Sequence, residues 1–236
     1  MTPSYALRLD SFIADGRLIR RNWTGTDAAG RETACLLAAL SPEVAKEHDP
    51  AACPANIMPS WLAHLTPWID DRGSLAAWPE MVRRYASLAH RWHVLSPSAW
   101  NRLDYRFRIA ALDEASEHYD HKAYPRVAAV VARVRALCTR AADGDMPGKR
   151  HWAETARAAE AAETVAVAAR AVAVAEARAA TATAARAVVW AVAATAARAV
   201  AWAVAVAWAA EAEAEAVDRL TAALFDLIEA EIALTG

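Results

Sequence analysis

Between residues 83 and 108, six arginines are interleaved with Tyr85, Trp92, Trp100 and Tyr105, a pattern suited to binding an anion. Arginine offers a planar fork of N–H donors that matches a phosphate, and an aromatic ring offers a face on which a base can stack. Asp104 is the only acid in this range, so its formal charge is +5. The candidate ligand-binding residues here are Arg83, Arg84, Arg91, Trp92, Arg102 and Arg106. The alternative is that these arginines are solvated or paired with nearby acids, namely Glu80, Asp113 and Glu114.

A second group of candidates lies in the alanine-rich part of the chain. Arg186 and Trp190 are four residues apart, as are Arg198 and Trp202, so on a helix each arginine can lie over an indole face. An arginine in an apolar helix is costly unless an anion satisfies it. That anion is either a glutamate of another helix or subunit, or a bound ligand.

Catalytic chemistry has weaker support. Glu114, Glu117, His118 and His121 share one side of a helix, but a di-iron bundle needs a second such motif, and the sequence lacks one. The more ordinary interpretation is a solvated helix end, although a metal site there stays open. Cys35 has apolar neighbours and is expected to be a buried thiol. No common hydrolase, nucleotide-binding or zinc motif occurs. The sequence therefore predicts no catalytic residue, metal site or cofactor.

Composition narrows the class of protein further. The chain is 56% hydrophobic with a formal net charge of −2, which excludes general disorder and a basic surface for duplex nucleic acid. Its three cysteines show no paired spacing, which favours a reducing compartment, and residues 1–20 lack the apolar core of a signal peptide. We expect a cytoplasmic protein.

The elements that would position these residues are helices. Alanine, the best helix former, accounts for 65 of the 236 residues. Turn signals in the first part of the chain predict helices over 5–21, 31–40, from 42 onward, 74–93, 96–118 and 125–142, with a short apolar segment at 59–69. Ser41, Ser74 and Ser96 are the expected N-caps. The fold predicted is all-α, a helical bundle with parts 1–148 and 149–236 sharing one core.

The second part, from residue 149, is a long alanine-rich helical region punctuated by arginine and tryptophan. Because one helix over 151–235 would exceed the size of a compact domain, this region either breaks into two to four helices or extends into a partner. The candidate breaks are at 181–183 and around 209–214. The last helix should bury Val217, Leu220, Leu224, Leu227, Ile228 and Ile232. Residues 200–208 alternate as a strand would, but alanine favours helix over strand. A membrane span over 187–210 is a further alternative, which Arg198 disfavours.

The alanine-rich region of residues 152–210 and its repeat AARAVVWAVAATAARAVAWAVAVAWAAE (residues 184–211) resemble alanine- and tryptophan-rich helical proteins of phage and bacterial genomes, some of which are labelled immunity proteins. GRETACLLAAL, CPANIMPSWLAHLTPW and AWPEMVRRYASLAHRW are similar to phage and mobile-element proteins. The resemblance implies a role in conflict between bacteria and viruses or toxins.

These observations together predict a non-enzymatic binding protein, of the counter-defence or immunity type. It would sequester a small anionic, nucleotide-like signal or block a host or phage protein. The alternatives are a structural oligomerisation protein and a metal-dependent hydrolase.

We also predict that the chain forms a homo-oligomer through residues 180–232. Their helices have more apolar surface than their polar stripes can cover, and small alanines let helices approach closely. Light scattering at micromolar concentration should report a dimer or larger species, whereas a monomeric mass would contradict this prediction.

Overall fold

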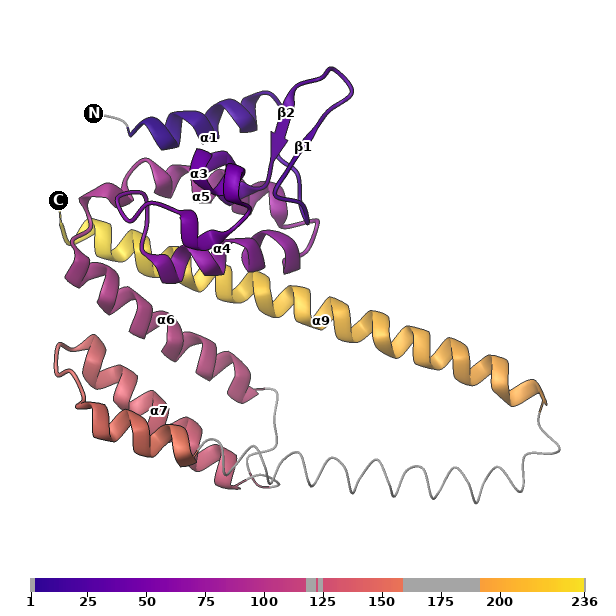
Figure 1. Ribbon diagram of the computed structural model, residues 1–236. Helices are drawn as coiled ribbons and strands as arrows, with labels where there is room; N and C mark the ends of the chain where they lie inside the picture. Colours follow the sequence, from indigo (N-terminus) through magenta and orange to yellow (C-terminus); the bar gives the residue numbers. More distant parts are fainter. Residues whose placement is uncertain (1–2, 118–121, 123–124, 159–191, 236) are drawn as a thin grey trace. The chain divides into compact units, whose positions relative to one another are not determined.

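The computed structural model describes residues 3–117, 122, 125–158 and 192–235, of which 115–117 and 192–212 are described as helix without side chains. The chain divides into two compact units (Figure 1). Unit 1 comprises Met1–Ala110 together with Ala212–Gly236, and unit 2 comprises Ala111–Glu211. The change of composition at Gly148 therefore falls within unit 2, and unit 1 is built from both ends of the chain.

Unit 1 is predominantly helical, in agreement with the predicted fold class. Its helices are α1 (Ser4–Ala14), α2 (Leu36–Leu40), α3 (Pro42–Glu47), α4 (Ser60–Arg72), α5 (Trp78–Ala89), most of α6 (Pro97–Glu117) and the last part of α9 (Val192–Ala233). Short 3-10 turns lie at Pro50–Ala52 and Trp92–Val94. Strands β1 (Thr24–Thr26) and β2 (Glu32–Ala34) form one small antiparallel hairpin.

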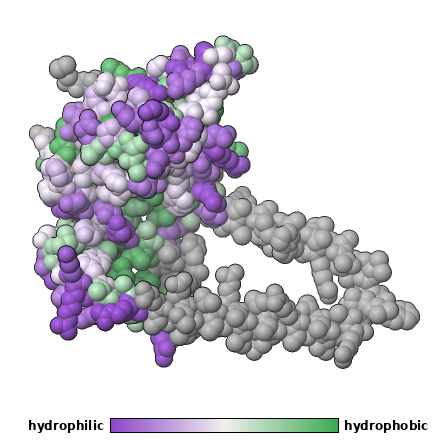
Figure 2. Space-filling model, in the orientation of Figure 1, coloured by the Kyte–Doolittle hydropathy of each residue, from purple (hydrophilic) through white to green (hydrophobic). Residues whose placement is uncertain are grey.

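The short helix α2 lies at the centre of the unit 1 core. All five of its residues are fully buried, and it contacts α1, α3, α4 and β2. Larger side chains from α4, α5 and α6 extend the core, among them Leu62, Tyr85, Leu88 and Leu103. The outer face of the molecule shown in Figure 2 is mostly hydrophilic over the part that contains the hairpin.

Two of the predicted helices are shorter than expected, because the chain forms the hairpin between them. The helix expected over 5–21 ends at Ala14, because Gly16 adopts a positive φ of 63° and the chain then extends so that Leu18 bridges Ala34. The helix expected over 31–40 begins only at Leu36. Residues before it form β2, because the turn closed by Gly30 returns the chain alongside β1.

The serine caps were predicted correctly at two of three positions. The Ser41 hydroxyl accepts from the Val44 N–H at the start of α3, and the Ser96 hydroxyl accepts from the Ala99 N–H at the start of α6. Ser74 instead closes the turn before α5 by accepting from the Ala77 N–H. Helix α5 begins later than expected because Pro79 is tolerated only in the first turn of a helix.

Unit 2 contains the end of α6, α7 (Pro125–Ala142), a helical stretch at 149–158 and the first part of α9. Helix α7 covers the predicted range, and Leu137 is buried as expected. The Arg135 guanidinium donates two hydrogen bonds to Asp113 on α6, at 2.7 and 3.0 Å, and this bonding lowers the pKa of the Asp113 carboxyl.

The break expected at 209–214 is wrong, because helix α9 runs without interruption from Val192 to Ala233. Its 42 residues contain no glycine or proline, so nothing in the sequence stops it. At 1.5 Å per residue it is about 63 Å long. Residues 200–208 are helical rather than extended, and the break proposed at 181–183 lies outside the described residues.

Within the described ranges, no helix is long and apolar enough to cross a membrane. The apolar stripe of the last helix is confirmed, since Val217, Leu224 and Ile228 are buried and Leu220, Leu227 and Ile232 pack against the core. This part of the surface predicted for oligomerisation is therefore covered by the chain itself.

Asp70, on α4, is the most deeply buried acid of unit 1 and joins three elements. Its side chain is fully buried, and it accepts hydrogen bonds from the Leu36 N–H at the start of α2 (3.1 Å) and from the Trp78 indole N–H of α5 (2.7 Å). Burial raises the pKa of the Asp70 carboxyl despite these two bonds. The residue thus anchors α2, α4 and α5 to one another.

Replacing Asp70 with alanine should lower the free energy of unfolding by about 3 kcal/mol, because the buried Leu36 N–H and the half-buried Trp78 indole N–H lose their acceptor. The Asp70→Asn variant tests the charge. Because the folded-state pKa is raised, the contribution of Asp70 to stability falls as pH rises from about 4 through that pKa. In urea unfolding, the stability of wild type relative to Asp70→Asn should therefore decrease between about pH 4 and pH 7. A relative stability that increases with pH would contradict this account.

Candidate functional site

The last part of α9 packs against α5 and α6, and this contact brings together most of the arginines predicted to bind a ligand. Leu224, Phe225 and Ile228 enter the core of unit 1. The Phe225 ring lies 6.1 Å from the ring of Tyr85 on α5. Acidic residues on either side of this apolar stripe lie within reach of arginines on α5 and α6.

Glu231 holds two of the predicted arginines. Its side chain is 1% exposed, and its carboxylate pairs with Arg102 through Oε1 and with Arg106 through Oε2, the latter at 3.2 Å. Both arginines extend from α6 and are 38% exposed. A buried carboxylate without a cation would be strongly unfavourable, so these arginines have a structural task.

Arg84 and Arg91, on and just after α5, are also paired with α9. The Arg84 guanidinium pairs with Asp226 and donates from Nε to Glu229 at 3.1 Å, and this bonding raises the pKa of Arg84. It also lies over the ring of Phe225, with its central carbon 5.5 Å from the ring centroid. Arg91 lies 4.0 Å from Glu229.

Arg83 and Trp92 have different surroundings from the other candidates. Arg83 is an exposed residue that pairs with Glu80 one turn earlier at 2.6 Å, as the alternative interpretation expected. Trp92 is 1% exposed and packs edge-on against Tyr85 and Trp100, so its faces are part of the core. The structure therefore brings Arg84, Arg91, Arg102 and Arg106 to one helix junction but gives them carboxylate partners.

The candidates of the alanine-rich region cannot be placed in this way. Arg186 and Trp190 lie outside the described residues. Arg198 and Trp202 belong to α9, of which only the backbone is described at these positions. The four-residue spacing that predicts an arginine over an indole remains a prediction for both pairs.

Other candidates for chemistry can be compared with the structure where it describes them. Burial raises the pKa of both the Cys35 thiol and the Cys53 thiol to about 11, so both are protonated at neutral pH. His118 and His121 lie outside the described residues. Among the residues that are described, no three histidine, cysteine or acidic side chains gather as a metal site would require.

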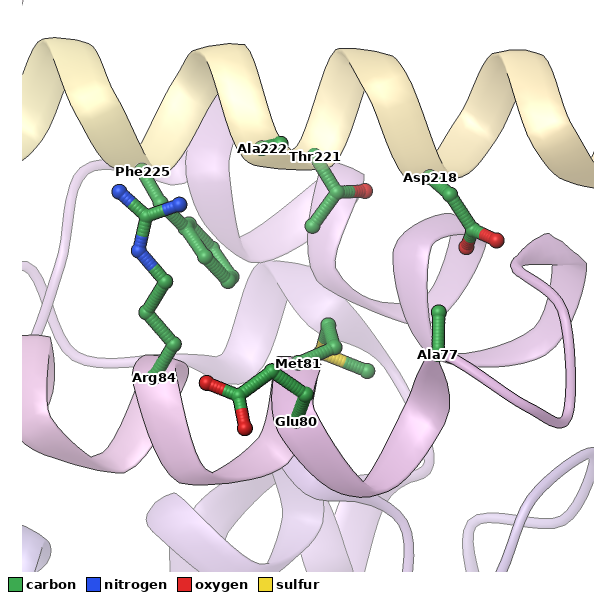
Figure 3. A pocket seen from close by; sticks show the side chains of 8 residues that line it. All are labelled: Ala77, Glu80, Met81, Arg84, Asp218, Thr221, Ala222 and Phe225. Carbon is green, nitrogen blue, oxygen red and sulfur yellow. The ribbon is translucent and has the colours of Figure 1, made fainter.

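A pocket of about 130 Å³ opens between α5 and α9 beside Arg84 (Figure 3). Met81 and Phe225 are its largest apolar lining residues, while Glu80, Arg84 and Asp218 contribute charged groups. The full lining is Ala77, Glu80, Met81, Arg84, Asp218, Thr221, Ala222 and Phe225. Arg84 and Phe225 form one end of the pocket, and Ala77 and Asp218 form the other.

Two polar groups of this pocket are not fully used within the chain. Thr221 is 5% exposed, and its hydroxyl oxygen is buried with no hydrogen-bond partner among the described residues. Asp218 accepts one hydrogen bond, from the Ser74 N–H at 3.1 Å, and no cation pairs with it in the described part of the chain. An unpaired buried hydroxyl costs stability, so a group that bonds to it from outside would be favoured.

Four residues of this junction were not among those predicted from the sequence, although a signal for two of them was present: Glu231, Asp226, Glu229 and Thr221. Thr221 and Glu231 follow the same helical spacing as Val217, Leu224 and Ile228. Polar residues at positions of an apolar stripe are expected to have specific partners or functions. Which residues would meet them depends on how α9 packs, which helical periodicity does not specify.

The pairing at Glu231 predicts a specific pattern of stabilities. Replacing Arg102 and Arg106 together with methionine should destabilise the chain by about 3–5 kcal/mol, because the Glu231 carboxylate stays buried without a cation. Adding Glu231→Leu should restore most of that loss. The exposed control Arg83→Met should cost about 0.5 kcal/mol or less. Thermal and urea unfolding measure all three, and unchanged stability in the double variant would show that the two arginines are not structural.

Comparison with known proteins adds no family to this description. No family model, curated protein or solved structure matches the chain. Interpretation of the site therefore depends on the geometry of the described residues.

Proposed function

We propose that this chain is a non-enzymatic binding protein in the conflict between bacteria and viruses or toxins, and that it acts by blocking a partner protein. The observation that carries the proposal is the α5–α9 pocket, which combines an apolar surface with an unpartnered hydroxyl. Protein interfaces typically place an anchoring side chain of one partner in such a pocket of the other. The setting of conflict comes from the sequence resemblance alone.

Blocking a protein is favoured over sequestering a nucleotide because of how the arginines are used. A phosphate at Arg102 and Arg106 would have to displace Glu231, whose side chain is 1% exposed. At Arg84 it would compete with two carboxylates, those of Asp226 and Glu229. Trp92 offers no free face to a base. The residues proposed for phosphate and base are thus already bonded to groups of the same chain.

A non-enzymatic role is supported by the state of the potential nucleophiles. A thiol acts as a nucleophile in its deprotonated form, and the raised pKa values of Cys35 and Cys53 keep both thiols protonated at neutral pH. Asp70, a buried acid that could act in proton transfer, is bonded to the Leu36 and Trp78 N–H groups. These two hydrogen bonds give the Asp70 carboxyl a structural role.

The proposal is tested with two matched leucine substitutions in adjacent residues. Ala77→Leu places a larger side chain in the pocket, whereas Ala76 is exposed and does not line it. The proteins would be expressed in bacteria that carry individual antiviral defence systems or toxins, and plaque formation or growth would be measured. We expect wild type and Ala76→Leu to relieve the inhibition of plaque formation or growth by at least one defence system or toxin. The same relief should be about tenfold or more weaker for Ala77→Leu.

Two results would contradict the proposal. One is the absence of relief in every system tested, and the other is equal activity of the two leucine variants. Calorimetry with cyclic and linear nucleotides provides a further test. If wild type binds a nucleotide and the Arg84→Ala/Arg102→Ala variant binds it more weakly, nucleotide sequestration is the better account of the function than protein blocking.

A further inference from the structure

We infer that the α5–α9 pocket receives one basic side chain, lysine or arginine, of the partner protein. This inference rests on the proposed function and names the chemistry of the group that the pocket would bind. It follows from the size of the pocket, from the order of apolar and charged groups along it, and from the two polar groups left without full partners.

The size and apolar surface fit the stem of such a side chain. A volume of about 130 Å³ accommodates a chain of a few methylene groups with a small polar head. Met81 and Phe225 supply the surface against which the methylene groups would pack. Lysine and arginine commonly bury their stems on apolar surface while the charged head reaches polar groups.

The charges of the pocket favour a cation over an anion. Among the described residues, Asp218 has no cationic partner and Glu80 pairs only with the exposed Arg83, an interaction that is weak and easily exchanged. The one cation that lines the pocket, Arg84, is neutralised by Asp226 and Glu229. An incoming ammonium or guanidinium group therefore meets carboxylates whose charge is not fully compensated.

Thr221 places an unpaired hydroxyl beside Asp218. Thr221 and Asp218 are three residues apart on α9, so their side chains lie on neighbouring positions of one helix face (Figure 3). The Thr221 oxygen would accept an N–H of the bound cation while the Asp218 carboxylate binds the same head. The hydroxyl that is unpaired in the free chain would then be satisfied in the complex.

The four methionines of the chain provide a direct test by NMR of ¹³C-labelled methionine methyl groups. Met81 lines the pocket, whereas Met58 lies in the core and Met146 is exposed in unit 2, so these two serve as internal controls. The probes are n-pentylammonium and n-butylguanidinium. The controls are 1-pentanol and pentane-1-sulfonate, which have an alkyl chain of the same length as n-pentylammonium but a neutral or an anionic head. We expect the cations to shift the Met81 signal selectively, with dissociation constants on the order of millimolar for molecules of this size.

Two isosteric variants refine the test. Asp218→Asn keeps an oxygen for the Ser74 N–H and should weaken cation binding about fivefold or more while leaving 1-pentanol unaffected. Thr221→Val should also weaken cation binding, yet it should raise the melting temperature by about 2–4 °C because it removes an unpaired buried hydroxyl. An unchanged Met58 signal shows that each variant is folded.

The inference is overturned if the sulfonate shifts Met81 as strongly as the cations do. It is also overturned if no probe shifts Met81 at tens of millimolar, or if Asp218→Asn binds the cations as wild type does. These outcomes are separate from those of the cellular test. Selective cation binding without relief of inhibition by any defence system or toxin would contradict the proposed function. Relief of inhibition without cation binding would contradict this inference alone.

Discussion

The carboxylate of Glu231 constrains the whole junction between the last helix and the rest of unit 1. Because it is buried, it must meet cations, and Arg102 and Arg106 of α6 supply them. This requirement sets both the rotation and the position of α9 along its axis. Phe225 then faces Tyr85, and Arg84 lies between Asp226 and Glu229. The pocket beside Arg84 exists only in that register, so the ion pairs at one end of the contact determine a cavity about two to four helical turns away.

The helical class and most of the helices could be predicted from residue types. Ser41 and Ser96 were identifiable as caps because a short hydroxyl side chain precedes a proline and an apolar run. The stripe from Val217 to Ile232 was evident from its spacing. The hairpin escaped prediction because Thr24–Thr26 and Glu32–Ala34 are three residues each, too short for their alternation to be distinguished from the start of a helix.

The candidate site was predictable only in part, and the reason is physical. An arginine that binds phosphate and one that binds carboxylate have the same sequence signature, because both groups accept from the same planar fork. The choice depends on acids that lie 125 to 145 residues away along the chain, such as Glu231 for Arg106 and Glu229 for Arg84. Helix periodicity identifies which face of α9 is buried but contains no information about which helix covers it.

Unit 1 is discontinuous, and this has a consequence for the order of events during synthesis. Residues 111–211 separate its two parts, so 101 residues must be translated after α5 and most of α6 before the closing helix emerges. At about 5–20 residues per second, the delay is roughly 5–20 seconds. Throughout it the surface around Tyr85 lacks Phe225 and Ile228, and Arg102 and Arg106 lack their buried acid. The nascent chain therefore presents an apolar and cationic surface for seconds, the kind of transient species on which chaperones act.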